Sequence, residues 1–158
     1  MPEKFRRLII ILTTTIFIYW FLSPSQEPTR ALPGPSLALS PSSLSIAAGQ
    51  NFTIDIMLDT AGQKVDGADV YFLNYNPGLL EVADANASLT GVQIAPGTLL
   101  ANTNANSVNI ATGKIQFSQT TLGGTTFIGS GKLATVTFKA LAVGSAYVNF
   151  NFTSGSTS

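Results

Sequence analysis

The segment from Val65 to Val82 constrains the fold of this chain more than any other stretch. Apolar and polar residues alternate up to Tyr75-Asn76-Pro77, and an apolar run resumes at Leu79. Period-two alternation places successive side chains on opposite faces of a strand, and the Asn-Pro pair favours a turn at its end. We therefore predict one strand over 68–75 and a second over 79–83, joined by a tight corner.

The rest of the chain after residue 35 has the pattern of short strands separated by turn residues. The cleanest alternation runs from Phe52 to Asp59, and its apolar members, Phe52, Ile54, Ile56 and Leu58, are predicted to face a core. No segment beyond the N-terminal leader shows a helical period. We predict an all-β fold, a sandwich of about nine strands with jelly-roll topology. The other expected strands are 37–39 with 44–46, 91–94, 98–101, 108–111, 114–119, 132–140 and 146–152, and 102–106 is expected to be a polar loop.

The N-terminus begins with a basic and then apolar leader. Basic residues between Lys4 and Arg7 precede an apolar run from Leu8 to Leu22. The run is shorter than the roughly 20 residues that a bilayer crossing needs and long enough for a signal peptide. Residues 1–25 are therefore expected to form a hydrophobic helix that exports the chain, either as a cleaved signal peptide or as a membrane anchor.

A proline-rich segment separates this leader from the strands. Residues 26–35 are expected to be an extended linker, because Pro28, Pro33 and Pro35 oppose regular structure. No internal repeat is visible in the remainder. Residues 36–158 are therefore expected to form one sandwich domain.

The composition limits the chemistry that the chain can perform. It contains no His and no Cys, which removes the commonest general base, the thiolate nucleophile and the soft metal ligands. The formal net charge is zero, so nothing in it indicates a nucleic-acid partner. We predict no enzymatic activity, no cofactor and no metal site. The acidic residues of the domain lack the spacing of a calcium loop or a glycosidase pair; they are Asp55, Asp59, Asp66, Asp69, Glu81 and Asp84.

A second motif follows the corner along the chain. It reads Gly131-Lys132-Leu133-Ala134-Thr135-Val136-Thr137-Phe138-Lys139. Together the two motifs resemble the cohesin family, the receptor modules of cellulosome scaffolds that capture dockerins, and the resemblance covers roughly Ser36 to the C-terminus. It implies an extracellular or cell-surface module that binds a dockerin-like protein in a polysaccharide-degrading or cell-surface assembly and performs no catalysis.

The resemblance also implies a binding surface on the 68–75 strand. Aligned on the Tyr-Asn-Pro corner, Tyr71 points inward, and Val70, Phe72 and Asn74 point outward onto the flat surface that contacts dockerins. Thr135 and Thr137 of the second motif are expected to line the same surface. An exposed Val70 and Phe72 would mark a contact patch on an otherwise polar protein. The alternatives are that both sets of side chains are partly buried, or that a bulge shifts the register of this strand and returns Asp69 to solvent.

Two other functions remain open at this point. Cohesins share their sandwich with certain cellulose-binding modules, but glycan recognition uses rows of aromatic rings and the single Trp, Trp20, lies in the leader. The other alternative is a structural or adhesion module of a larger envelope protein. Cohesin-like domains usually continue beyond the strand that matches 146–152 with one more strand, so the chain is expected to be a fragment that lacks its last strand.

Three triplets of the N-glycosylation type are present. They begin at Asn51, Asn86 and Asn151. Chance alone produces such triplets in a chain rich in Asn and Thr, so the sequence by itself assigns none of them.

Overall fold

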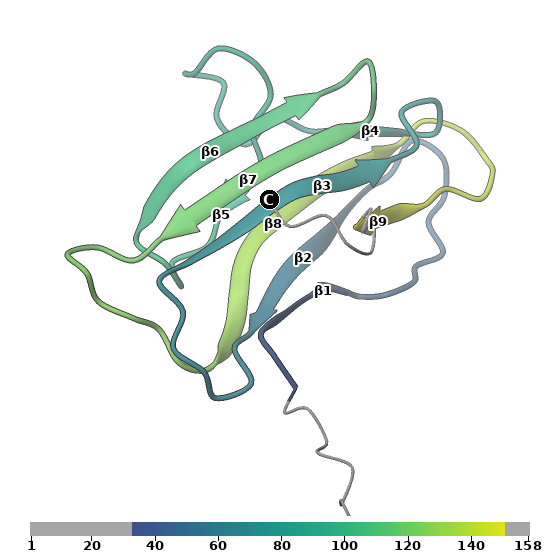
Figure 1. Cartoon of the computed structure of the whole chain (residues 1–158). Helices are drawn as coiled ribbons and strands as arrows, with labels where there is room; N and C mark the ends of the chain where they lie inside the picture. Colours follow the sequence, from purple (N-terminus) through teal and green to yellow (C-terminus); the bar gives the residue numbers. More distant parts are fainter. Residues whose placement is uncertain (1–32, 151–158) are drawn as a thin grey trace, which may run out of the picture. The chain divides into compact units, whose positions relative to one another are not determined.

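Residues 33–150 form two antiparallel β-sheets that pack face to face in a computed structural model of the chain (Figure 1). The structure describes these residues, apart from the side chain of Phe72. The predicted N-terminal helix and most of the linker lie outside them. Within residues 33–150 there is no helix, and hence none that is long and apolar enough to cross a membrane.

The first sheet has the strand order β1-β2-β8-β4, with the short β5 also pairing with β8, and the second has the order β6-β7-β3-β9. All pairings are antiparallel. In the first sheet the strands are β1 (Ser36–Ser40), β2 (Asn51–Asp59), β4 (Leu80–Val82), β5 (Ala95–Pro96) and β8 (Ser130–Ala140); in the second they are β3 (Gly67–Tyr75), β6 (Asn102–Asn109), β7 (Lys114–Thr120) and β9 (Val148–Phe150).

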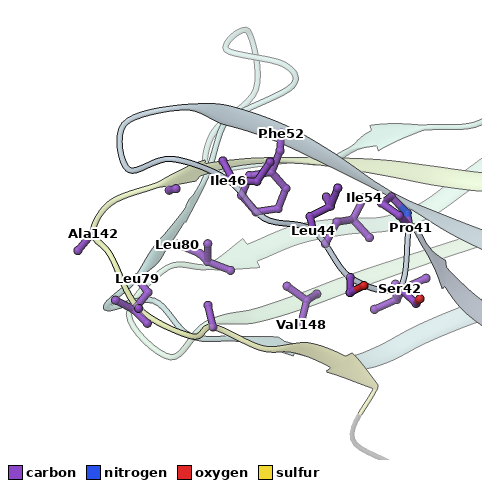
Figure 2. A pocket seen from close by; sticks show the side chains of 15 residues that line it. Pro41, Ser42, Leu44, Ile46, Phe52, Ile54, Leu79, Leu80, Ala142 and Val148 are labelled. Carbon is purple, nitrogen blue, oxygen red and sulfur yellow. The ribbon is translucent and has the colours of Figure 1, made fainter.

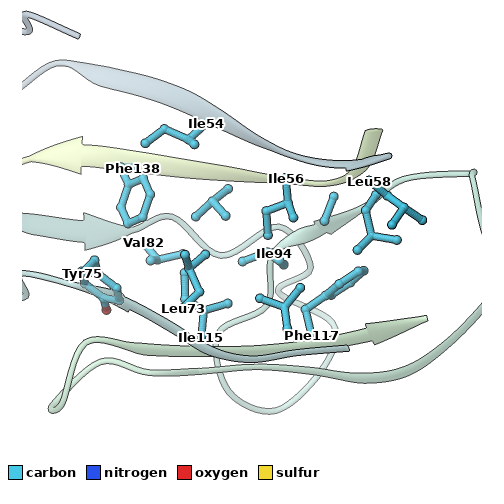
Figure 3. Close-up of a cluster of buried hydrophobic side chains, with 14 of the residues drawn as sticks. Ile54, Ile56, Leu58, Leu73, Tyr75, Val82, Ile94, Ile115, Phe117 and Phe138 are labelled. Carbon is cyan, nitrogen blue, oxygen red and sulfur yellow. The ribbon is translucent and has the colours of Figure 1, made fainter. Parts of the chain in front are cut away.

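The core lies between the two sheets, where the alternating apolar residues meet (Figure 3). In β2, Ile54, Ile56 and Leu58 are buried, as their spacing predicts. Phe52 is half-buried and stacks on Phe138 of β8, with 5.6 Å between ring centroids. The predicted inward face of β2 is therefore confirmed, and it packs against side chains from both sheets.

The corner predicted at Tyr75-Asn76-Pro77 is confirmed, and it transfers the chain from one sheet to the other. β3 ends at Tyr75, and β4 begins at Leu80 in the opposite sheet. The carbonyl oxygen of Asn76 accepts hydrogen bonds from the backbone N–H groups of Leu79 (3.2 Å) and Leu80 (2.9 Å). The Asn76 side chain accepts another from the N–H of Gly78 (3.0 Å). Asn76 thus satisfies the backbone groups that the corner leaves unpaired.

The strand list differs from the prediction in several places. Segments 44–46 and 98–101 are not strands, and 91–94 contributes only an isolated bridge between Val92 and Val108. The expected polar loop over 102–106 is wrong, because this segment is the first part of β6. Its polar side chains are satisfied within the sheet: the Asn104 amide donates to the Thr120 hydroxyl across β6 and β7 (3.0 Å). Most residues of this edge strand are exposed and polar, so its sequence lacks the alternation of apolar and polar residues from which strands are predicted.

Candidate functional site

A β-bulge in the middle of β3 decides which of its side chains face solvent. Val70 pairs with Phe117 of β7, and Leu73 pairs with Ile115, so Tyr71 and Phe72 together oppose the single residue Gln116. Two residues opposite one reverse the inside-outside alternation of the strand beyond that point. Before the bulge the even-numbered residue Val70 points into the core. After the bulge the odd-numbered residues Leu73 and Tyr75 do.

Val70 lies in the core and not on the surface. Its side chain is 1% exposed, and that of Tyr71 is 56% exposed. The expectation of an outward Val70 and an inward Tyr71 is therefore wrong, because the alignment on the corner assumed an unbroken alternation through the bulge. Asp69 is exposed, as the alternative with a bulge predicts. Phe72 lies within the bulge, and the structure does not describe its side chain.

Asn74 lies on the outer face of its sheet, as predicted. Its neighbours Leu73 and Tyr75 point into the core, at 0% and 2% exposure. Asn74 is half-buried and pairs with Lys114 of β7 on one side and with Asn149 of β9 on the other. Its Oδ1 is buried and accepts no hydrogen bond in the described part of the chain.

Thr135 and Thr137 lie on the other sheet. They alternate in β8 with buried Ala134, Val136 and Phe138, so they point away from the core. The Thr135 hydroxyl donates to the Asp55 carboxylate of β2 (2.6 Å), which also lies 3.6 Å from the ammonium group of Lys132. The prediction that these threonines share one surface with Asn74 is wrong, because β3 and β8 belong to different sheets.

The outer face of the second sheet gathers a set of polar side chains, which we call the β3/β7 face. In β7, Ile115 and Phe117 are buried and the intervening residues point outward. A shallow hollow on this face lies between β3, β6 and β7, lined by Tyr71, Ser107, Asn109, Lys114 and Gln116. The β3/β7 face comprises these five residues with Asp69, Asn74 and Ser118.

The β3/β7 face carries little charge. Asp69 and Lys114 are its two charged residues, one of each sign. The other members are amides, hydroxyls and one phenol, which donate and accept hydrogen bonds without net charge. Such a surface can contact a partner through hydrogen bonds and the ring of Tyr71, with little dependence on long-range attraction.

Sequence reasoning missed Tyr71 as a surface residue, and it gave 114–119 as a strand without saying which of its faces points outward. The pairing of Asp69 with Ser118 and of Asn74 with Lys114 shows that β7 presents its even-numbered residues. The available signal was Asp69, because a carboxylate at a core position is costly unless it is hydrogen-bonded.

A second hollow, lined mainly by apolar side chains, lies between the segment after β1 and the start of β9 (Figure 2). Leu44, Ile46, Phe52 and Val148 line it, and Leu44 and Ile46 remain partly exposed. The hollow contains no ionisable side chain. It therefore offers packing surface and no acid–base chemistry.

No metal centre is visible in residues 33–150, where no three His, Cys, Asp or Glu side chains come together. The fold perturbs the ionisation of Tyr75. Burial, with a smaller contribution from the negative charge of Glu81, raises the pKa of Tyr75 above its ordinary value of 10.0. A neutral buried phenol in the core is structural, since its ring contacts Phe138 edge-on with centroids 5.4 Å apart.

Comparisons with known proteins agree with this architecture. The family model for the Cohesin domain matches residues 37–158. A type II cohesin domain from the cellulosome of Acetivibrio cellulolyticus has a similar structure, with a TM-score of 0.58, 18% identity and 78% of each chain covered. The seventh ScaB type I cohesin of Pseudobacteroides cellulosolvens gives a TM-score of 0.51 with 19% identity, covering 74% of this chain and 75% of that one.

A third similar structure is the sixth cohesin of scaffoldin B from A. cellulolyticus, solved in complex with a mutant Cel5 dockerin. It gives a TM-score of 0.53 with 18% identity and covers 77% of this chain and 84% of that one. The search of curated proteins gave no match. The family match spans most of the chain and the structural matches share its fold, and the chain therefore belongs to the cohesin family.

Proposed function

We propose that this chain is an exported, non-catalytic receptor module that captures a dockerin-type protein through the β3/β7 face. The observation that carries the proposal is the bulge in β3, which exposes Tyr71 beside Gln116 on the outer face of one sheet. Bulges commonly re-aim side chains at functional sites. An exposed aromatic ring surrounded by hydrogen-bonding groups is typical of a protein contact.

The membership of the family supports a protein partner. Two similar structures are complexes of a cohesin with a dockerin, both from A. cellulolyticus. The β3/β7 face is nearly uncharged and offers many hydrogen-bonding groups around one small hollow. The module would therefore hold a dockerin-bearing protein in a larger complex, and any enzymatic activity would belong to that captured protein.

The geometry gives less support to a polysaccharide ligand. The exposed tyrosines in residues 33–150 are Tyr71 and Tyr147, which come from β3 and from the segment before β9. Stacking on a glycan chain needs several aromatic faces in a row. Two separate rings do not provide such a platform.

The location that we propose is the cell exterior. The basic and apolar leader over residues 1–25 supports export, and residues 26–35 would space the domain from the membrane or from the cleavage site. The β3/β7 face contains a single carboxylate, Asp69, whereas a calcium site needs several oxygen ligands, so we expect any calcium requirement of binding to come from the partner. A surface fraction and a cytosolic fraction of the producing cells, probed with an antibody to the domain, would locate the chain.

The binding experiment uses the full chain in a mild detergent and a panel of purified dockerins with calcium present. Capture of at least one dockerin in a pull-down is expected. A double variant, Thr135→Ala with Thr137→Ala, should capture the same dockerin equally well, since these residues lie on the other sheet. Failure of the folded chain to bind any dockerin, with retention on an insoluble polysaccharide, would overturn the proposal.

A further inference from the structure

Asn86 begins the triplet Asn86-Ala87-Ser88 on the loop that joins β4 to β5. Every residue from 84 to 91 is exposed. An Asn-X-Ser or Asn-X-Thr triplet is the acceptor sequence for N-linked glycans, and it must be reachable by the transferring enzyme. The structure provides that access at Asn86.

Local hydrogen bonds hold this triplet in a turn. The Asp84 carboxylate accepts from the backbone N–H groups of Asn86 (3.1 Å) and Gln93 (3.0 Å), which fixes both ends of the loop. The Asn86 carbonyl oxygen Oδ1 accepts from the N–H of Ser88 (3.2 Å). The amide nitrogen Nδ2 of Asn86 makes no hydrogen bond within residues 33–150, so it is available to react.

The Asn51 triplet has the same sequence pattern in a very different setting. Asn51 begins β2 and pairs with Lys139 of β8. Phe52 stacks on Phe138, and Thr53 pairs with Thr137. Presenting this triplet to an enzyme would require β2 to leave the centre of its sheet, which costs much of the stability of the domain. Asn51 is therefore a matched internal control, and Asn151 lies outside the described residues.

A shallow hollow next to Asn86 suits a sugar ring. It lies between this loop and the edge strand β6, and its lining includes Asn86, Leu89, Pro96 and Asn104. Leu89 is 59% exposed and would contact the apolar face of a ring. The side-chain amide of Asn104 is hydrogen-bonded to Asn102 and Thr120 and retains one further N–H and one oxygen lone pair for a sugar.

We propose that Asn86 is the acceptor of an N-linked oligosaccharide. This inference depends on the export that is part of the proposed function. In the transfer, Nδ2 forms a bond to the anomeric carbon of an oligosaccharide carried on a polyprenyl pyrophosphate. The bond from that carbon to the pyrophosphate oxygen breaks, and the lipid pyrophosphate leaves with the electron pair. The amide nitrogen gives up one proton to a base of the transferase.

A glycan at this position would cover one side of the module. The hollow adjoins β6, which is the edge strand of the sheet that carries the β3/β7 face. Edge strands expose unpaired backbone groups and are sites of unwanted pairing unless something covers them. The glycan would shield this edge and the exposed Leu89 while leaving Tyr71, two strands away, accessible.

The test is transfer to the purified full chain. The folded chain is incubated with an oligosaccharyltransferase and a polyprenyl-pyrophosphate-linked oligosaccharide, and the products are mapped by peptide mass spectrometry. One glycan at Asn86 is expected. Asn86→Gln and Ser88→Ala should abolish it, Ser88→Thr should retain it, and Asn51→Gln should leave it unchanged.

Two results of the transfer assay would overturn the inference: no transfer to the folded chain, or transfer to Asn51 with Asn86 unmodified. Peptide mass spectrometry of the protein recovered from the surface of the producing cells supplies a second readout. An unmodified Asn86 peptide as the sole form there would also refute the inference. Neither measurement involves a dockerin, so failure of dockerin capture and failure of glycan transfer are distinguishable.

Discussion

Val70 of β3 is the cross-strand partner of Phe117 of β7, and the two side chains are 1% and 0% exposed. The residue that follows, Tyr71, begins the bulge and points outward with 56% of its surface exposed. One extra residue in β3 thus determines that Val70 lies in the core and that Tyr71 lies on the β3/β7 face. Neighbouring positions on β3 are therefore expected to respond very differently to mutation.

Substituting Val70 with Asp should unfold or strongly destabilise the domain. A carboxylate buried without a partner, together with the lost packing, is expected to cost about 3–5 kcal/mol. Urea unfolding followed by circular dichroism measures the free energy of unfolding. Asp69→Asn changes the exposed neighbour and should stay within about 0.5 kcal/mol of wild type. Equal stability of the Val70→Asp variant would show that Val70 is not in the core.

Substituting Tyr71 with Ala should weaken capture of a dockerin without destabilising the fold. Removing an aromatic residue from the centre of a contact surface commonly costs about 2 kcal/mol or more, which is roughly a 30-fold loss of affinity. Isothermal titration calorimetry measures this change. Ile128→Ala removes a side chain of similar exposure, 53%, from the segment before β8 of the other sheet, and should bind like wild type. An Ile128 effect as large as the Tyr71 effect would contradict the assignment of the surface.

Substituting Gly113 with Ala should destabilise the domain through a steric conflict at the corner. Gly113 has φ of +64°, and an added Cβ would overlap the Tyr75 carbonyl oxygen and lie 2.8 Å from Pro77 Cδ. Gly123 has the same φ of +64°, but the space around its Cβ position is empty. Gly123→Ala therefore reports the backbone strain alone, about 1 kcal/mol.

The difference between these two glycine variants isolates the clash. We expect the free energy of unfolding to fall about 1–3 kcal/mol further in Gly113→Ala than in Gly123→Ala, which is the cost typical of overpacking. Thermal unfolding of the two variants side by side measures it. Equal melting temperatures would mean that the turn after β6 does not contact the corner closely.

Raising the pH above 10 should destabilise the fold in part through Tyr75. Because the pKa of Tyr75 is raised in the folded state, the unfolded chain loses the phenolic proton at a lower pH. The stabilising contribution is fully present below the unfolded pKa and is lost as the pH rises through the folded one. Tyr75→Phe should therefore flatten the alkaline fall in melting temperature. Parallel curves for Tyr75→Phe and wild type would refute this.

The sequence predicted those parts of the fold in which local pattern and burial agree. The inward face of β2 follows an unbroken alternation of large apolar residues, and the corner after Tyr75 follows from Asn76-Pro77. The first part of β6 was missed because its polar side chains, such as Asn104, are satisfied by cross-strand hydrogen bonds and leave no apolar signal. The predicted strand over 108–111 overlaps only the last two residues of β6. A pattern of apolar residues detects strands that face a core, and β6 mostly does not.

The candidate site was predicted less well, for a physical reason. Which residues of β3 face solvent depends on the bulge opposite Gln116, and a bulge is a relation between two strands that one strand does not show. Asn74, beyond the bulge, was placed correctly relative to the corner, and Val70, before it, was not. Thr135 and Thr137 were assigned to the wrong sheet because strand order is a property of the whole fold.

The most direct test of the proposed binding surface is to map it in a complex. Amide chemical shifts of the isotope-labelled full chain would be recorded with and without a dockerin that it captures. Large shifts are expected along β3, β6 and β7 around Tyr71 and Gln116, with β2 and β8 around Asp55 and Thr135 unchanged. Shifts centred on Thr135 and Thr137, with Tyr71 unaffected, would contradict the assignment of the β3/β7 face as the binding surface.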